Sequence, residues 1–185
     1  MKEAGFDQVS MSVEHGDQDF LDKTIGKRLE LKEVVASIDI AHEAGLLVHN
    51  NFMMGFPFET AENRQRTIDF AKSLKSDSFS VSLAAPLPGT KLWTVCKEND
   101  LFPENLDVER LVYDQVNIKP HDIEPKDLLN LVSNLNQELN LAAQMRSKKA
   151  KDKYKLLKNK ETSSDRKYLS NVDTPRRKPE NVNQI

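Results

Sequence analysis

Residues 31–54 read LKEVVASIDIAHEAGLLVHNNFMM, and this stretch predicts a helix, a stop and a strand in that order. Five apolar residues recur at three- and four-residue spacing, as on one face of an amphipathic helix: Leu31, Val34, Val35, Ile38 and Ala41. Gly45 follows where a helix commonly ends, because glycine adopts the left-handed conformation of the C-terminal cap at little cost. Residues 46–54 then form a strand-like run.

A short echo of this stretch lies near the start of the chain. Residues 3–6 read EAGF and residues 43–46 read EAGL, and in both places a strand-like run follows the glycine. In the first copy that run is residues 9–13, VSMSV, in which apolar and small polar side chains alternate. The echo predicts that residues 1–4 are the end of a helix, with Met1 as a truncation point or an internal start.

A third unit has the same order of elements. Thr60 is a candidate N-cap for a helix through Leu74, residues 79–85 read as another strand, and Thr90 is a candidate cap for a short helix. Alternating helices and strands of this length are typical of parallel βα units. An eight-stranded barrel needs about 200 residues or more. We therefore predict an α/β fold, a partial (β/α) barrel of about three to four parallel units, which leaves one strand edge exposed.

The remainder of the chain predicts a C-terminal extension. Residues 111–118 give a weak strand signal, and Asp122 and Pro125 are expected to introduce a long helix rich in leucine. The predicted organisation is a partial barrel over residues 1–120, a helix packed on it over 121–150, and a basic, largely disordered tail over 151–185.

Composition argues against a membrane-spanning protein and against a disulfide-rich one. The chain has 185 residues, 38% of them hydrophobic, a mean hydropathy of −0.61 and no apolar run of the roughly 20 residues that a membrane span needs. Its single cysteine, Cys96, excludes an internal disulfide and a cysteine-based metal cluster within this chain, and makes the cytoplasm the expected compartment.

The net charge of −2 combines two unlike parts of the chain. Residues 146–185 contain 13 basic and 5 acidic side chains, whereas residues 1–145 contain 14 basic and 24 acidic ones. A basic tail is able to touch nucleic acid or an anionic membrane. A solvated extension is the favoured interpretation, because no aromatic-rich or base-reading module accompanies the charge.

The candidate site is the rim formed by the loops at residues 14–16, 55–60 and 86–90, because ligands of parallel α/β folds bind at the carboxyl ends of the strands. Glu14 is either a ligand-binding carboxylate or a solvated or helix-capping glutamate. Gly55 either lets the backbone approach a ligand or makes a simple tight turn.

The other candidate residues favour structural roles. His15 is expected to be a surface histidine, since no second histidine or cysteine stands at metal-ligand spacing. Glu59 is expected to support a helix N-terminus. His42 and His49 fall within helix and strand patterns that favour packing, and Cys96 is expected to be a buried filler.

Three rim segments together resemble one known family. Residues 5–16, GFDQVSMSVEHG, are similar to the fourth-strand segment of radical S-adenosylmethionine (SAM) enzymes, closest to the class often coupled to a cobalamin-binding domain. Residues 52–60, FMMGFPFET, resemble the family's fifth-strand segment, and residues 86–92, PLPGTKL, resemble the segment after its sixth strand. The resemblance covers about residues 1–100.

The resemblance implies the second half of an incomplete (β/α)6 barrel. In such enzymes a reduced [4Fe–4S] cluster cleaves SAM to a radical that abstracts hydrogen from the substrate, and some members transfer a methyl group through cobalamin. By this resemblance Glu14 and Ser12 would contact the SAM ribose or amino group, and a second set of residues would line the adenine side or lie next to it: Met53, Met54, Gly55, Leu83 and Pro86.

This chain departs from the family in two places. The three cluster-ligating cysteines are absent, so the chain alone is expected to be inactive and to need the missing N-terminal barrel half, or a partner chain that supplies it. Phe58 stands where the family often has a second glycine. The alternative is a standalone, non-catalytic βα-fold binding protein that docks a partner through its basic tail. The substrate is not indicated.

Overall fold

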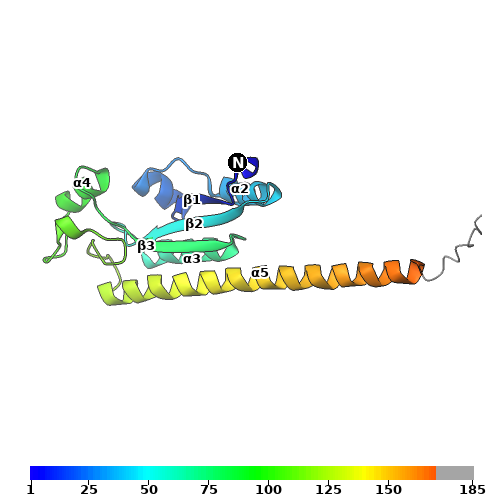
Figure 1. The fold of residues 1–185 in the computed structure, drawn as a ribbon. Coiled ribbons are helices and arrows are strands. Elements are labelled where there is room, and N and C mark those ends of the chain that lie inside the picture. The colour runs from blue at the N-terminus through cyan, green and yellow to red at the C-terminus, as the bar shows by residue number, and fades with distance from the viewer. Residues whose placement is uncertain (170–185) are drawn as a thin grey trace, which may run out of the picture. The chain divides into compact units, whose positions relative to one another are not determined.

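Three parallel strands form a single sheet at the centre of the fold. The computed structural model describes the backbone of residues 1–169 and the side chains of residues 1–148 apart from Arg110. The strands pair in the order β1-β2-β3, with the bounds β1 (Gln8–Glu14), β2 (Leu47–Met54) and β3 (Ser78–Leu83) (Figure 1). Helix α2 (Leu31–Glu43) connects the first pair of strands and α3 (Ala61–Ser73) the second. The predicted α/β class is confirmed, and three parallel strands with helices between them are consistent with a partial β/α barrel.

The remaining elements are mostly short, apart from the C-terminal helix. They are η1 (Lys2–Ala4), α1 (Gln18–Phe20), the π-helical turn η2 (Leu21–Ile25), α4 (Lys91–Glu98), η3 (Val108–Arg110) and α5 (Pro125–Leu169). The chain divides into two compact units, residues 1–145 and 146–185. The predicted disordered tail begins within α5, and its last sixteen positions, 170–185, lie outside the described residues. Within the described part, no helix combines the length and the apolar character required to cross a membrane.

Short polar side chains begin two of the helices as predicted. Thr60 accepts a hydrogen bond from the backbone N–H of Asn63, whose side chain accepts one from the Thr60 N–H, so the two form a capping box. Thr90 likewise accepts a bond from the Trp93 N–H at the start of α4. Gly45, with φ of 74°, follows α2 in the left-handed conformation.

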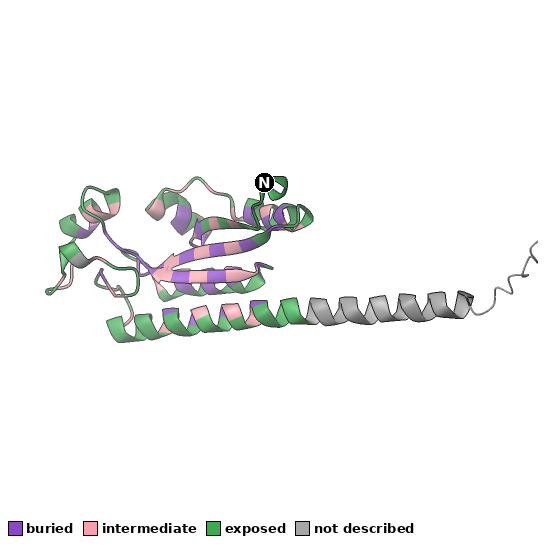
Figure 2. Cartoon of the chain, in the orientation of Figure 1, coloured by how far each residue is buried: buried purple, intermediate pink, exposed green. Residues whose placement is uncertain are grey.

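The core lies on one face of the sheet. Alternate residues of β2 and β3 are buried, and Figure 2 shows this alternation as stripes along both strands. On the buried face they pack against side chains of α2, α3 and α5, among them Ile38, Ile68 and Leu135. Each large apolar side chain buried on this face contributes roughly 1.5–3 kcal/mol to the free energy of folding.

The outer edge of β3 is closed by two amide side chains of α5. Asn136 Oδ1 accepts from the Val81 N–H at 2.7 Å, and its Nδ2 donates to the Val81 carbonyl at 2.6 Å. Asn140 makes the same pair of bonds to Phe79, at 3.0 and 2.9 Å. The two asparagines are four residues apart and so lie on one face of the helix. They therefore satisfy the strand edge that would otherwise invite another strand.

The outer edge of β1 is the open one among the described residues. The Asp7 carbonyl accepts from the Leu47 N–H at 2.8 Å, so alternation along β1 turns the backbone groups of Gln8, Ser10 and Ser12 away from β2. The Lys27 ammonium donates to the Ser12 carbonyl. The predicted exposed strand edge is therefore the outer side of β1.

Two details of the C-terminal region differ from the prediction. Residues 111–118 form turns rather than a strand; there the side-chain amide of Asn117 donates to the carbonyls of Ala84, Val112 and Gln115. Asp122 does not cap α5. Its carboxylate accepts from the Ala61 N–H at 2.7 Å and pairs with Arg64, so it supports the N-terminus of α3 instead.

Candidate functional site

The face of the sheet opposite the core is polar. Its half-buried and exposed side chains come from alternate positions of all three strands: Ser10, Ser12, His49, Asn51, Met53, Ser78, Ser80 and Ser82. The strand register aligns them in rows across the sheet, Ser10 beside His49 beside Ser78 in one row, and Ser12 beside Asn51 beside Ser80 in the next. We call these eight residues the open face.

A hydrogen-bond network centred on His49 orders the open face. His49 Nδ1 lies 2.8 Å from Ser78 Oγ, and its Nε2 lies 3.1 Å from both Asn51 Oδ1 and Ser80 Oγ. Asn51 Nδ2 donates to Ser10 Oγ at 2.8 Å. Since Asn51 Oδ1 only accepts, Nε2 is the nitrogen that donates to it. Sequence reasoning assigned His49 to packing and missed this network, although the shared alternation of the three strands was a usable signal.

Glu14 lies where β1 leaves the sheet. A bulge between Ser12 and Glu14 shifts the register, and Glu14 has φ of 72°, a left-handed conformation uncommon for residues other than glycine. Its Oε1 lies 3.2 Å from Lys27 Nζ, and 23% of its side chain is exposed. The carboxylate is therefore held at the end of the open face and remains accessible to a ligand.

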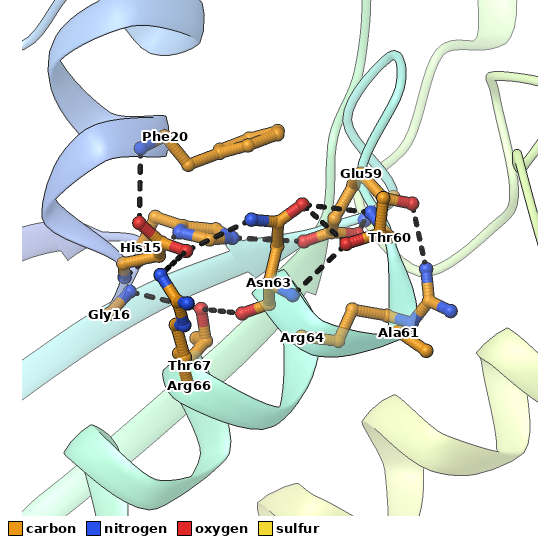
Figure 3. Close-up of polar contacts among 12 residues, drawn as sticks. His15, Gly16, Phe20, Glu59, Thr60, Ala61, Asn63, Arg64, Arg66 and Thr67 are labelled. Atoms are coloured by element: carbon orange, nitrogen blue, oxygen red, sulfur yellow. Dashed lines mark hydrogen bonds and ion pairs between the residues drawn. The ribbon is translucent and has the colours of Figure 1, made fainter.

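His15 and Glu59 join the first rim loop to the second. His15 Nε2 lies 3.2 Å from Glu59 Oε1, and the exposed fractions of the two side chains are 0% and 1% (Figure 3). Glu59 Oε2 also accepts from the Gly55 N–H at 2.6 Å. The Asp17 N–H donates to His15 Nδ1 at 3.1 Å, so Nε2 is the nitrogen that donates to Glu59. The expectation that His15 is a surface histidine is wrong, because a carboxylate 44 positions away gives it a buried partner.

Aromatic packing encloses this pair. The His15 ring stacks on Phe20 with ring centroids 4.4 Å apart, and it meets the edge of Phe56 at 6.3 Å. Two phenylalanines therefore separate the imidazole from solvent, which strengthens its bond to Glu59.

Asp17 connects the segment after the first rim loop to α3 through hydrogen bonds and an ion pair. Its carboxylate accepts from the Phe20 N–H, from Asn63 Nδ2 at 2.9 Å and from Arg66 Nη1 at 3.1 Å. Burial would raise the pKa of Asp17, but the hydrogen bonds from Asn63 and Phe20 and the charge of Arg66 outweigh burial and hold this pKa below its usual value. Asp17 is therefore a structural anion of the rim.

Close backbone contact completes this junction. The Gly16 N–H donates to Thr67 Oγ1 at 3.0 Å, and a Cβ added to Gly16 would lie 2.6 Å from the Thr67 Cα. Only glycine fits there without moving α3.

The third rim loop is buried only where it leaves β3, and its residues 87–90 are exposed. The Ala84 N–H donates to the Met54 carbonyl at 2.8 Å, and both Ala84 and Pro86 are buried. Cys96, on α4, is also fully buried, and burial raises the pKa of its thiol to about 11. It lies in a second apolar cluster with Phe20 and Phe56, as expected for a filler.

The residues predicted to contact SAM lie in two places. Ser12, Glu14 and Met53 lie on the open face or at its carboxyl end. Met54 and Leu83 point into the helix-covered core, where they are at most 1% exposed. Gly55, with φ of 78°, is buried between them, and a Cβ there would lie 3.2 Å from Leu128 Cδ2. The structure therefore brings the first three together and separates them from Met54 and Leu83.

Comparison with known proteins finds one family model and several relatives that match parts of this chain. Residues 1–71 match the model of the radical SAM superfamily. The chain is 36% identical over 102 residues to an uncharacterized methyltransferase of Pyrococcus horikoshii, which is 55% of this chain and 22% of that protein. It is 28% identical over 148 residues to cytidylyl-2-hydroxyethylphosphonate methyltransferase of Streptomyces wedmorensis, covering 76% of this chain and 28% of that protein.

A third relative is named for a different reaction. The chain is 24% identical over 136 residues to tRNA-2-methylthio-N(6)-dimethylallyladenosine synthase of Thermosipho melanesiensis, covering 71% of this chain and 27% of that protein. The chain thus spans about a quarter of the length of the curated relatives it matches. The family match and these relatives together support the placement of this chain in the radical SAM superfamily.

Proposed function

We propose that this chain forms the SAM-binding rim of a radical SAM enzyme. The observation that supports the proposal is the position of Glu14, an accessible carboxylate held by a backbone bulge at the carboxyl end of a polar sheet face. In parallel α/β folds this is the end of the sheet at which ligands bind. The family match over residues 1–71 includes β1, Glu14 and the whole second rim loop.

The residues at this rim suit the polar part of SAM. The Glu14 carboxylate can accept hydrogen bonds from ribose hydroxyls or from the amino group, and such charge-assisted bonds are the stronger kind. The Ser12 hydroxyl lies on the same face, and the half-buried Met53 offers a thioether surface for an adenine ring. When bound, SAM would supply the group that reacts, while these side chains bind and orient it.

The iron–sulfur cluster that the family implies does not fit this chain by itself. Cys96 is its one cysteine; it is fully buried, and its raised pKa disfavours the thiolate that ligates iron. No group of three or more His, Cys, Asp or Glu side chains in the described residues is arranged to hold a metal ion. We therefore place the cluster ligands outside this chain, and no step of the reaction is assigned to residues here.

The open edge of β1 offers the place where further barrel strands would pair. The edge of β3 is already closed by Asn136 and Asn140, so the sheet can extend on the side of β1. A longer polypeptide or a partner chain would supply those strands.

A cytoplasmic location and the use of cobalamin belong to this proposal as well. The location rests on the low cysteine content, and the use of cobalamin rests on the sequence resemblance.

A binding experiment on the 185-residue chain tests the proposal. In saturation-transfer NMR with SAM, we expect weak binding, with signal transferred to the adenine and ribose protons. Glu14→Ala should reduce that transfer severalfold, because it removes the acceptor of the polar contacts. Glu33→Ala, at an exposed position of α2, is the matched control and should leave the transfer unchanged.

Two results would contradict the proposal. One is SAM binding that Glu14→Ala does not alter, and the other is the absence of any transfer to SAM from the folded wild-type chain. The second result would favour a standalone binding protein without a SAM site.

A further inference from the structure

A mostly apolar pocket lies beside the rim, apart from the predicted SAM residues. Its volume is about 430 Å³, and it is bounded by η2, by the loop after β2 and by the first turns of α4. In Figure 1, α4 lies beyond the carboxyl ends of the strands. The apolar walls come from side chains of all three segments, chiefly Ile25, Phe56, Phe58, Leu92 and Val95. This volume is within the range of pockets that hold small molecules.

Phe58 is strained and yet exposed at this pocket. Its φ is 62°, in the left-handed region that disfavours a bulky side chain. Backbone strain of this kind persists when contacts of the side chain offset its cost. However, 49% of Phe58 is exposed, whereas its neighbour Phe56 is only 7% exposed. Burial within the described chain therefore does not explain why an aromatic ring is held here.

The charge of the pocket is positive. Lys23 and Lys91 both line it, and no acidic side chain does. Lys23 pairs with Asp19 at 3.0 Å, but about three quarters of each side chain is exposed, so this pair is weak and easily exchanged. Among the described residues, Lys91 has no carboxylate within ion-pair distance.

We propose that this pocket binds an apolar organic anion, with an aromatic or aliphatic body and one carboxylate or phosphate group. The body would pack against Phe56, Phe58 and Leu92, and the anionic group would meet the ammonium groups of Lys23 and Lys91. Walls on three sides favour a free small molecule over the headgroup of a membrane lipid. The proposal does not depend on the SAM site, because none of the residues predicted to contact SAM lines the pocket.

The probe for a first test is 8-anilino-1-naphthalenesulfonate, an aromatic anion that fluoresces when it leaves water. We expect it to saturate one site on the folded chain and to be displaced by decanoate. Decyltrimethylammonium, which has the same apolar chain and a positive charge, should displace it at least about tenfold less well. Anionic phosphatidylglycerol vesicles should not sediment the chain.

Two variants and a control locate the site. Lys91→Glu should weaken probe binding about tenfold or more, whereas Lys97→Glu, on an exposed part of the same helix outside the pocket, should leave it unchanged. Phe58→Gly should weaken binding without lowering the melting temperature, because glycine accepts the positive φ.

Several outcomes would overturn the proposal. They are equal displacement by the cationic and anionic amphiphiles, probe binding that Lys91→Glu and Phe58→Gly leave unchanged, and binding to vesicles in place of free decanoate.

Discussion

His15 Nε2 lies 3.2 Å from Glu59 Oε1, and both side chains are almost completely excluded from solvent. This contact joins the loop after β1 to the loop after β2 at the end of the sheet where a ligand would bind. Glu59 also fixes the Gly55 N–H, so one carboxylate orders both loops. The geometry of the rim therefore depends on a buried polar pair rather than on apolar packing alone.

Removal of this carboxylate should be costly. Glu59→Ala leaves the His15 and Gly55 N–H groups buried without an acceptor, and we expect the free energy of unfolding to fall by about 3 kcal/mol in urea titrations. Glu62→Ala, two positions after Thr60 and with 74% of its side chain exposed, is the control and should cost less than about 1 kcal/mol. If Glu59→Ala lowered the free energy of unfolding no more than Glu62→Ala does, the buried pair would not stabilise the rim.

The edge of β3 should open when its amide partner is removed. Asn136→Leu leaves the N–H and carbonyl groups of Val81 without the Asn136 amide, and should lower the free energy of unfolding by about 1–3 kcal/mol. An unsatisfied edge also promotes pairing between molecules, so light scattering after size exclusion should show more dimer.

Asn134→Leu controls for the added apolar surface. Asn134 is exposed on the same helix. If its substitution produced as much self-association as Asn136→Leu, the effect would come from hydrophobicity and not from the opened edge.

Local patterns predicted the elements well because their causes are local. The caps at Thr60 and Thr90 and the turn at Gly45 depend on residues within three or four positions, and each is present in the structure. The strands followed from period-two alternation, which reports burial of one sheet face.

The candidate site was less predictable because its contacts join distant segments. The partner of His15 is Glu59, and Asp122 supports α3 from a distance of 61 positions in the chain. The weak strand signal at 111–118 failed for a related reason. This segment meets the edge of β3 through the bond from the Leu83 N–H to the Tyr113 carbonyl at 2.8 Å, whereas side chains of α5 bond the rest of that edge at Phe79 and Val81. Tertiary pairing of this kind leaves no local pattern.

Acid should destabilise the fold through Asp17. A carboxyl group with a folded pKa below its unfolded value of 3.8 stabilises the protein above that pH and loses the contribution as the pH falls through the folded pKa. The free energy of unfolding of the wild type should therefore fall as the pH drops below about 4 and through the folded pKa of Asp17.

Asp17→Asn should flatten this pH dependence, because the variant has no proton to take up at that position. Asp19→Asn, with about three quarters of the wild-type side chain exposed, should retain the wild-type slope. Identical slopes in all three proteins would show that Asp17 does not link folding to pH.

The most direct test of the SAM-binding rim is a map of amide shifts in ¹⁵N-labelled chain titrated with SAM. We expect the shifts to concentrate at Ser12, Glu14 and Met53, at the carboxyl end of the open face, and to shrink severalfold in Glu14→Ala. Shifts confined to other parts of the molecule, or unchanged in Glu14→Ala, would contradict it.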